Sequence, residues 1–340
     1  YMKPNFKIFN KNITSQSPAL IIAEVGINHM GDVNLCEDMI LSALDAGADC
    51  VKLQTVNVDE SYHPSTESYK VFKGAELNIE EINFLVDVAE KNNGFLFSTP
   101  ADFASLKLLN LTKMKAYKVS SGLLGNLPLI SEISKTNIPI ILSTGMANDR
   151  DIIKALNALK NYNKSGLALL HCVSLYPASK DMLNLSYINT IYKKYNIISG
   201  YSDHSDGPLA CIAAISKGAK IIEKHFTINN NIKGADNAMS MDAKSFKSMC
   251  NDIRDVEKMI HGSKLKPHPM EKKIKKLRYR KIVAKHDIAI GEEINFNNIN
   301  FMRININEES LDASKWHLLS GKKSKIFINK FSPVTLKHIV

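Results

Sequence analysis

Two histidines follow two short apolar segments of the sequence. His204 ends a polar cluster after segment 195–199, and His225 ends a similar cluster after segment 219–222. An apolar, alanine-rich stretch with helical periodicity, 208–217, separates them. Because a parallel strand–helix–strand unit places the carboxyl ends of its strands side by side, we expect the two imidazoles to meet. Two neutral imidazoles can bind a divalent metal ion, although one histidine at a helix start and one packed in a core would give the same spacing.

Side chains that bind ions or transfer protons also follow the other apolar segments. A random set of strands would leave several of these positions apolar. In a barrel of parallel strands the catalytic groups lie at the carboxyl ends of the strands, so the pattern predicts an active site there. The strand ends carry Glu24; Lys52 and Gln54; Ser98 and Thr99; Lys118, Ser120 and Ser121; Ser143 and Thr144; His171; Ser202, Asp203 and His204; and Glu223, Lys224 and His225.

The elements that must position these residues alternate regularly between strand and helix. Eight such units predict an α/β fold of the (β/α)₈, or TIM, barrel type. A doubly wound dinucleotide-binding sheet would need fewer strands and a glycine-rich first turn, where this chain has Glu24. The stretch 56–75 is polar and irregular. We expect strands near 19–23, 48–55, 95–97, 116–119, 139–142, 167–170, 195–199 and 219–222, and helices near 33–46, 79–92, 102–111, 127–135, 149–161, 187–195, 208–217 and 243–261.

The remainder of the chain is expected to form a second domain. The segment after the last helix is basic and contains Pro267 and Pro269, which is typical of a linker. Beyond it, short β-like runs such as 282–284, 288–292 and 301–303 alternate with turns. We therefore expect a catalytic barrel over residues 1–262, a linker over 263–280 and a small β-rich domain over 281–340.

Composition narrows the class of function. The 340 residues carry a net charge of +10, but the lysines are scattered, so an anionic small molecule is favoured over nucleic acid as a partner. No apolar run reaches the roughly 18 residues of a membrane span. Residues 1–17 lack an apolar signal core, so we expect a cytoplasmic protein with no membrane partner. The five cysteines form no CxxC pair, which argues against a thiolate zinc site.

Several of these motifs together resemble the sialic acid synthase family, the synthases of N-acetylneuraminic and other nonulosonic acids. The C-terminal part, from 283–288 to 321–323, is similar to that family's antifreeze-like (SAF) domain. The resemblance therefore spans nearly the whole chain. The matching segments in the predicted barrel are 22–29, 51–55, 97–100, 143–146, 171–172, 176–177, 200–204 and 223–227.

The resemblance implies an activity. Such an enzyme condenses phosphoenolpyruvate with an N-acyl amino sugar aldehyde, giving a nonulosonic acid and phosphate through carbon–carbon bond formation and a tetrahedral intermediate. It uses a divalent metal, manganese or else magnesium or cobalt, which polarises the aldehyde oxygen. It works as a domain-swapped homodimer, in which the small domain of one subunit covers the barrel of the other.

The resemblance also assigns roles to residues of this chain. His204 and His225 are the expected metal ligands. Glu24 is the first candidate to orient or deprotonate the attacking water, Glu223 is the second, and Asp236 is either a catalytic and sugar-binding acid or a turn residue. The expected phosphoenolpyruvate contacts are Lys52, Thr99, Lys118, Ser121, Ser174 and Ser202, and the expected sugar contacts are Gln54, Tyr176, Asp236 and Arg303.

Three positions depart from the family's pattern. Leu123 stands where an acid is usual, Ser174 where asparagine is usual, and Arg303 lacks the usual Pro-Gly turn after it. The exact sugar therefore stays open among N-acetylmannosamine, a 2,4-diacetamido hexose and others. A 3-deoxy-heptulosonate-type or octulosonate-type synthase, or a sugar-binding homologue with impaired catalysis, remains an alternative.

Overall fold

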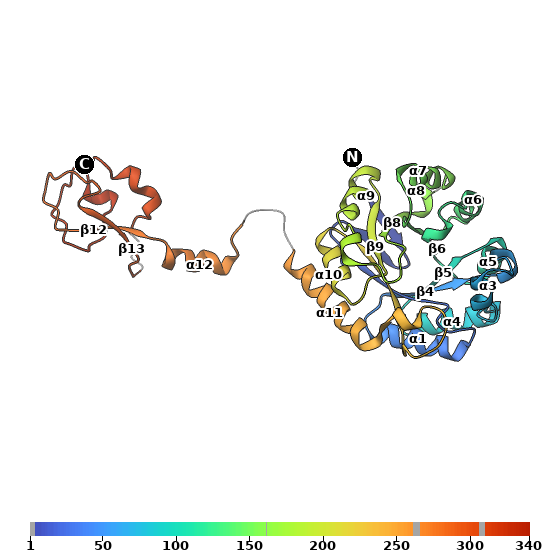
Figure 1. Ribbon diagram of the computed structural model, residues 1–340. Coiled ribbons are helices and arrows are strands. Elements are labelled where there is room, and N and C mark those ends of the chain that lie inside the picture. Colours follow the sequence, from blue (N-terminus) through green and yellow to red (C-terminus); the bar gives the residue numbers. More distant parts are fainter. Residues whose placement is uncertain (1–3, 161, 261–265, 306–309) are drawn as a thin grey trace. The chain divides into compact units, whose positions relative to one another are not determined.

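The computed structural model describes residues 4–160, 162–260, 266–305 and 310–340 (Figure 1). The chain divides into two compact units, Tyr1–His261 and Gly262–Val340. The predicted boundary between barrel and linker, at 262/263, lies outside the described residues. Within those residues, no helix combines the length and apolar character needed to cross a membrane.

The larger unit is a closed parallel barrel, which confirms the predicted fold. Within the described residues, eight parallel strands pair in chain order, and the last pairs with both its predecessor and the first. A two-residue strand, β11 (Met241–Asp242), pairs with the last two residues of β10. The barrel strands are β3 (Leu20–Gly26), β4 (Cys50–Thr55), β5 (Leu96–Pro100), β6 (Tyr117–Val119), β7 (Ile140–Ser143), β8 (Leu167–Cys172), β9 (Ile198–Asp203) and β10 (Ile221–Thr227).

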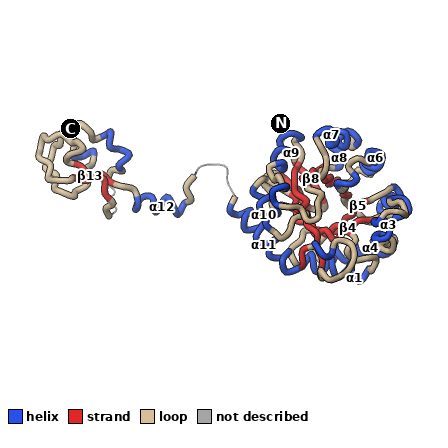
Figure 2. Tube along the Cα trace, in the orientation of Figure 1, coloured by secondary structure: helices blue, strands red, loops and turns tan. Residues whose placement is uncertain are grey.

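Helices surround the barrel, as Figures 1 and 2 show. Their apolar faces pack on the strands, which are buried throughout except at half-buried Gln54 in β4. Side-chain caps begin several helices; Asn78 and Asn148, for example, each form a capping box. The helices are α1 (Val33–Asp45), α4 (Ile79–Lys91), α5 (Phe103–Leu109), α6 (Leu127–Lys135), α7 (Asp149–Ala158), α8 (Tyr162–Ser165), α9 (Tyr187–Tyr195), α10 (Leu209–Ser216) and α11 (Ala243–Met259).

An N-terminal hairpin, which the sequence did not indicate, covers the amino ends of the barrel strands. It consists of β1 (Asn5–Ile8) and β2 (Lys11–Thr14). Phe6 is fully buried beside Gly166, just before β8, and the Phe9 ring stacks on Phe95, just before β5, with a centroid separation of 4.3 Å. The hairpin therefore lies at the end of the barrel opposite the predicted active site.

Two short helices occupy the stretch that was predicted to be irregular. They are α2 (Val58–Ser61) and α3 (Glu67–Phe72). The Asp102 carboxylate ties the start of this stretch to α5, because it accepts hydrogen bonds from the backbone of residues 57 and 105 and from the Ser61 hydroxyl. The stretch is thus fixed to the barrel mouth by polar contacts that no local sequence pattern predicts.

The smaller unit has its own apolar core. Strands β12 (Lys281–Ala284) and β13 (Ile299–Met302) pair antiparallel, as the β-rich expectation requires. The expected run at 288–292 forms only an isolated bridge, between Ile288 and Ile328. The predicted linker contains helix α12 (Pro269–Arg278). The helix begins with a proline at N1 and a capping box, so the proline that suggested a linker in fact starts a helix. Short 3₁₀ turns, Ala313–Leu318 and Leu336–His338, complete the described part.

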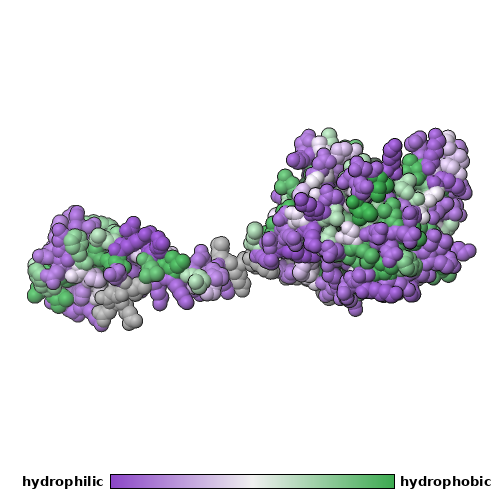
Figure 3. Space-filling view, turned by 90° about the horizontal axis from the view of Figure 1, so that it is seen from below, coloured by the Kyte–Doolittle hydropathy of each residue, from purple (hydrophilic) through white to green (hydrophobic). Residues whose placement is uncertain are grey.

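The larger unit shows both hydrophilic and hydrophobic side chains on its surface. On the face drawn in Figure 3, hydrophobic side chains gather near the middle within a hydrophilic rim. All five cysteines are buried and free.

Candidate active site

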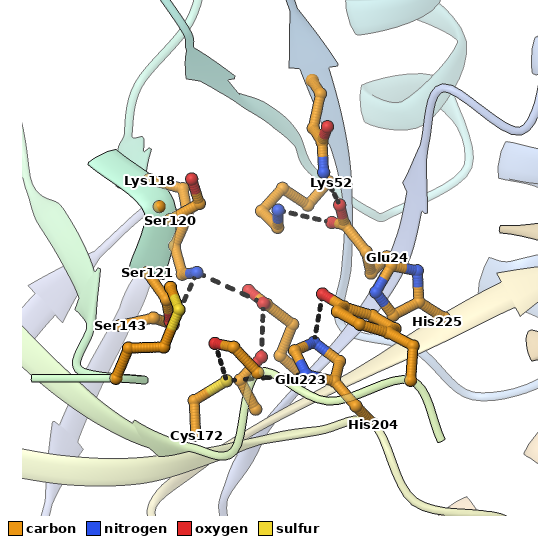
Figure 4. Close-up of a pocket in the computed structure, with 16 residues that line it drawn as sticks. Glu24, Lys52, Lys118, Ser120, Ser121, Ser143, Cys172, His204, Glu223 and His225 are labelled. Carbon is orange, nitrogen blue, oxygen red and sulfur yellow. Dashed lines mark hydrogen bonds and ion pairs between the residues drawn. The ribbon is translucent and has the colours of Figure 1, made fainter. Parts of the chain in front are cut away.

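A cavity of about 320 Å³ lies at the carboxyl ends of the barrel strands (Figure 4). Because every barrel strand contributes its last residues to this end, side chains far apart in sequence meet here. Most of the predicted site residues line the cavity: Glu24, Lys52, Gln54, Lys118, Ser121, Ser174, Tyr176, Ser202, His204, Glu223 and His225.

Three predicted residues lie elsewhere. Thr99 stands behind Lys52 and accepts a hydrogen bond from its ammonium at 3.4 Å. Asp236 is at the edge of the site, with one carboxylate oxygen 3.6 Å from Nδ1 of His225. Arg303 belongs to the smaller unit, where it is exposed and its Nε donates to the Arg278 carbonyl at 3.3 Å.

Glu24 and Lys52 form a buried ion pair on neighbouring strands. The Lys52 ammonium is 2.6 Å from Glu24 Oε2, and each side chain is only 2% exposed. Gln54 donates its amide to the other oxygen of Glu24 at 3.1 Å. Burial raises the pKa of Glu24, even though the Lys52 charge opposes this effect. Glu24 therefore takes up a proton more readily than an ordinary carboxylate does.

Lys118 and Glu223 form the second buried pair, across the cavity. Their charged atoms are 3.2 Å apart, and the Lys118 ammonium also donates to the Ser143 hydroxyl at 2.8 Å (Figure 4). Ser202 donates to the same oxygen of Glu223 at 2.8 Å. Burial opposes ionisation of Glu223, but the Lys118 and Lys52 charges and the Ser202 hydrogen bond outweigh it and lower its pKa to about 2. Glu223 is thus a fixed anion.

The two histidines meet, as their positions in the sequence predicted. The ring centroids of His204 and His225 are 5.4 Å apart. Nδ1 of His204 is 2.8 Å from the Val173 carbonyl, so it carries the proton, and Nε2 is left to face the Tyr176 hydroxyl at 2.9 Å. This is the tautomer that metal-binding histidines adopt when a carbonyl orients them.

His225 provides the second imidazole nitrogen of the site. Its Nδ1 is buried and has no hydrogen-bond partner among the described residues, because Asp236 at 3.6 Å is too distant. Burial, together with the charges of His204 and Lys52, lowers the pKa of His225 well below its usual value, so the ring is neutral. This unpartnered nitrogen lies on the ring next to His204, whose Nε2 contacts the Tyr176 hydroxyl, and two imidazole nitrogens on adjacent rings fit a divalent cation that displaces that hydroxyl.

Some cavity residues received no role from the sequence. Ser120 and Ser143 were recognised only as strand ends, and Cys172 only as part of a motif. Met146, the last residue of the 143–146 motif, is 74% exposed at the rim and has a left-handed backbone with φ of +63°. Gly145 precedes it, and a Cβ there would lie only 2.3 Å from the Ser174 hydroxyl and 2.6 Å from the Ser121 hydroxyl. Glycine therefore lets these two hydroxyls approach the same backbone.

The sequence is similar to a known protein family and to characterised members of it. The sequence profile of the NeuB family matches residues 39–266. The chain is 37% identical over 302 residues to the N,N'-diacetyllegionaminic acid synthase of Campylobacter jejuni, an alignment that covers 84% of this chain and 90% of that protein.

Solved structures agree with this similarity. The N-acetylneuraminic acid (sialic acid) synthetase of Leptospira borgpetersenii, in complex with citrate, aligns with a TM-score of 0.76 at 34% identity, covering 81% of this chain and 96% of that chain. A spore coat polysaccharide biosynthesis protein from Bacillus subtilis aligns over 99% of both chains, with a TM-score of 0.68 at 31% identity.

Proposed function

Because the chain belongs to the NeuB family, we propose that it condenses phosphoenolpyruvate with an N-acyl amino sugar aldehyde to give a nonulosonic acid and phosphate. Its similarity to these relatives identifies it as an enzyme, a phosphoenolpyruvate-dependent transferase of the sialic acid synthase type. The observation that carries the proposal is the pair of buried lysines at the carboxyl end of a closed barrel, each held by a buried glutamate.

The lysines suit the charged substrate. Phosphoenolpyruvate has a carboxylate and a phosphate, and buried ammonium groups bind such anions through charge-assisted hydrogen bonds. Lys52 and Lys118 are each about 2% exposed, and hydroxyls of Ser121, Ser174 and Ser202 line the same cavity. Before substrate binds, the paired glutamates orient the two ammonium groups. In the proposed complex the anion also accepts hydrogen bonds from each ammonium.

The two glutamates then have different tasks. C3 of phosphoenolpyruvate forms a bond to the aldehyde carbon, whose oxygen takes up a proton, and water adds to the resulting cation at C2. Glu24 accepts a proton from that water, because burial raises its pKa and makes it a stronger base than an ordinary carboxylate. The C2–oxygen bond to phosphate finally breaks as the C2 hydroxyl becomes a ketone. Glu223, with a pKa of about 2, stays ionised and stabilises the cation.

A divalent metal ion, manganese or else magnesium or cobalt, would be held by Nε2 of His204 and Nδ1 of His225. When bound, it would supply Lewis-acid polarisation of the aldehyde oxygen. Among the described residues no cluster of three or more histidine, cysteine or acidic side chains could hold a metal. The protein would therefore contribute two ligands, and Asp236, beside His225, would orient the sugar.

Calorimetric titration with Mn²⁺ tests this metal site without relying on turnover. His204→Ala is expected to abolish the binding heat, whereas His286→Ala, at an exposed position of the smaller unit, leaves it unchanged. A chelator should abolish turnover of the wild type. Unaltered Mn²⁺ binding by His204→Ala would contradict the assignment.

Gln54, Tyr176 and Asp236 are the proposed sugar contacts within the barrel. By resemblance, Arg303 would reach the sugar from a partner subunit in a domain-swapped homodimer, with the smaller unit acting as the antifreeze-like domain. A cytoplasmic location belongs to the same proposal.

Phosphate release tests the function directly. Purified protein is incubated with phosphoenolpyruvate, Mn²⁺ and a panel of N-acyl amino sugars, pentose and tetrose phosphates. Phosphate release with an N-acyl amino sugar, and not with the sugar phosphates, supports the proposal. Release only with a sugar phosphate of four or five carbons would indicate a heptulosonate-type or octulosonate-type synthase, and binding without release would indicate a homologue that has lost catalysis.

A further inference from the structure

The amide of Asn28, just beyond strand β3, reaches across to the loop that follows β10. Its Nδ2 donates to the Phe226 carbonyl at 2.9 Å and to the Ser240 hydroxyl at 3.0 Å, and its Oδ1 accepts the backbone N–H of Asp236 at 2.9 Å. We propose that Asn28 and Ser240 are positioning residues, which fix Asp236 at the barrel mouth so that its carboxylate can accept hydrogen bonds from sugar hydroxyls. The inference rests on the proposed function, in which Asp236 contacts the sugar.

Ser240 closes this contact into a ring. Its hydroxyl accepts a hydrogen bond from Asn28 and donates one to the Asp236 carbonyl at 2.7 Å. The N–H and the C=O of Asp236 are therefore both held, one by Asn28 directly and the other through Ser240. Asn28 is 1% and Ser240 is 5% exposed, so breaking these hydrogen bonds would leave buried polar atoms without partners. The backbone of Asp236 is thus fixed in place.

A second buried amide, that of Asn237, holds the same loop. Its Nδ2 donates to the Asn28 carbonyl at 3.1 Å, and its Oδ1 accepts the Thr227 hydroxyl at 2.6 Å. The side chain of Asn230 donates to the carbonyls of residues 237 and 240, at 2.9 and 2.7 Å. The loop is therefore tied both to its own start at the end of β10 and to the segment after β3. Buried hydrogen bonds that form a connected network of this kind reinforce one another.

The backbone just before Asp236 requires such support. Gly234 has φ of +100°, and Ala235 has φ of +47°, in the left-handed region that residues with a Cβ seldom adopt. A strained conformation persists only where the surrounding contacts determine it, and such conformations cluster at ligand-binding sites. The network around Asn28 supplies those contacts immediately after the turn. The strain and the network together point to a loop whose shape serves Asp236.

The carboxylate of Asp236 is the polar group that the network leaves available. It lies 3.6 Å from Nδ1 of His225, and none of the described residues donates a hydrogen bond to it. By contrast, the side chains of Asn237 and Ser240 form their hydrogen bonds within the loop and with Asn28. A carboxylate that is held in place before the sugar arrives loses less conformational entropy on binding, so the sugar binds more tightly.

A double-mutant cycle distinguishes positioning from a purely structural role. Calorimetry measures the dissociation constant of an unreactive sugar analogue, with phosphoenolpyruvate and Mn²⁺ present, so no variant has to turn over. The analogue is N-acetylmannosaminitol or, if a different sugar of the panel releases phosphate, the alditol of that sugar. Asp236→Ala should raise the dissociation constant about tenfold, because a hydrogen bond to a charged group is lost.

Ser240→Ala should raise the same constant about fivefold while Asp236 is present. In the Asp236→Ala background the change at Ser240 should have no further effect, because the effects of residues that act through one another are not additive. The affinity for phosphoenolpyruvate should stay the same in Ser240→Ala. Asn230 is exposed, so Asn230→Ala loosens the loop without altering a buried side chain, and it should weaken binding of the analogue in the same direction.

Ser134→Ala is the matched control. It removes a similarly buried hydroxyl, which donates to the Ser131 carbonyl in α6, and it should leave the dissociation constant unchanged. An unchanged constant in Asp236→Ala or in Ser240→Ala, or an equal loss from Ser240→Ala in both backgrounds, would overturn the inference. The proposed function is judged separately, by phosphate release from the wild type with an N-acyl amino sugar.

Discussion

The ammonium of Lys224 lies 2.7 Å from the carboxylate of Asp203, and both side chains are buried. The two residues are direct partners in the pairing of β9 with β10, and each immediately precedes a proposed metal ligand in the chain. Successive side chains of a strand point to opposite faces, so this pair lies on the far side of the strands from His204 and His225. Lys224 also donates to the Ser205 carbonyl. The pair therefore holds together the two strand ends on which the histidines stand.

Replacing Lys224 by methionine should destabilise the larger unit by about 3–5 kcal/mol, because it leaves a buried carboxylate without its cation. Urea denaturation measures the loss. The double variant Lys224→Met/Asp203→Asn removes the stranded charge and should be more stable than Lys224→Met alone. If the single variant is as stable as the wild type, the pair does not fix the strand ends.

Replacing Lys52 or Lys118 by methionine should weaken phosphoenolpyruvate binding. Each change removes a charge-assisted hydrogen bond, with an expected loss of about 1.5–3 kcal/mol in apparent affinity. Steady-state kinetics with saturating sugar give the KM for phosphoenolpyruvate, and Lys247→Met, at an exposed ion pair with Asp45, is the matched control. A shift in the KM for the sugar alone would show that these lysines bind the other substrate.

Stability should fall in mild acid because of His29. The side chain is fully buried, and burial lowers its pKa from 6.5 to about 4. Between these values the unfolded chain binds a proton that the folded chain does not, so stability is complete above pH 6.5 and is lost as the pH falls toward 4. The full difference amounts to about 3 kcal/mol.

Urea denaturation at several pH values between 7 and 4.5 measures this effect. His29→Asn removes the titrating group, so the free energy of unfolding of this variant should depend less steeply on pH than that of the wild type. Asparagine can still accept the hydrogen bond that Gly31 donates to His29 Nδ1 at 3.1 Å. Parallel pH profiles for the two proteins would assign the acid sensitivity to other groups.

Mixed dimers test whether Arg303 serves a partner's barrel. Arg303→Ala and His204→Ala subunits are each expected to be inactive. If the active site uses Arg303 of the partner subunit, a mixed dimer contains one barrel with an intact His204 and a neighbouring intact Arg303, and part of the activity returns. If Arg303 serves its own barrel, both barrels of the mixed dimer are defective. Absence of recovery, with mixed dimers shown to form, excludes the swapped arrangement.

The barrel was predictable because its signals are local and repeated. Most strands begin with a short apolar run, and the helices α6 and α9 begin and end where their periodicity indicated. The strand ends were predicted less accurately, since β9 continues beyond the predicted end to Asp203 and β10 to Thr227. Polar residues do not interrupt a strand whose backbone pairs on both sides, so the polar clusters marked the site and not the end of pairing.

The site was predictable as a set of residues and not as a set of contacts. Placing acids, lysines and histidines at one end of the barrel needs only the strand order. Which lysine pairs with which glutamate depends on the register and reach of side chains across the barrel, as with Lys118 on β6 and Glu223 on β10. The short helices α2 and α3 could not be predicted from the sequence, because they depend on tertiary hydrogen bonds to Asp102 and Glu76.

The N-terminal hairpin has a kinetic consequence. It covers the amino ends of the strands, and the barrel interior is packed, so ligands approach from the mouth, where Tyr176 is 53% exposed, while Lys52 and Lys118 lie almost completely buried beneath. In the proposed reaction we expect the anion to bind at the lysines first and the sugar second, because both would enter through this opening. Phosphate would then leave last, and it should compete with phosphoenolpyruvate in product-inhibition experiments.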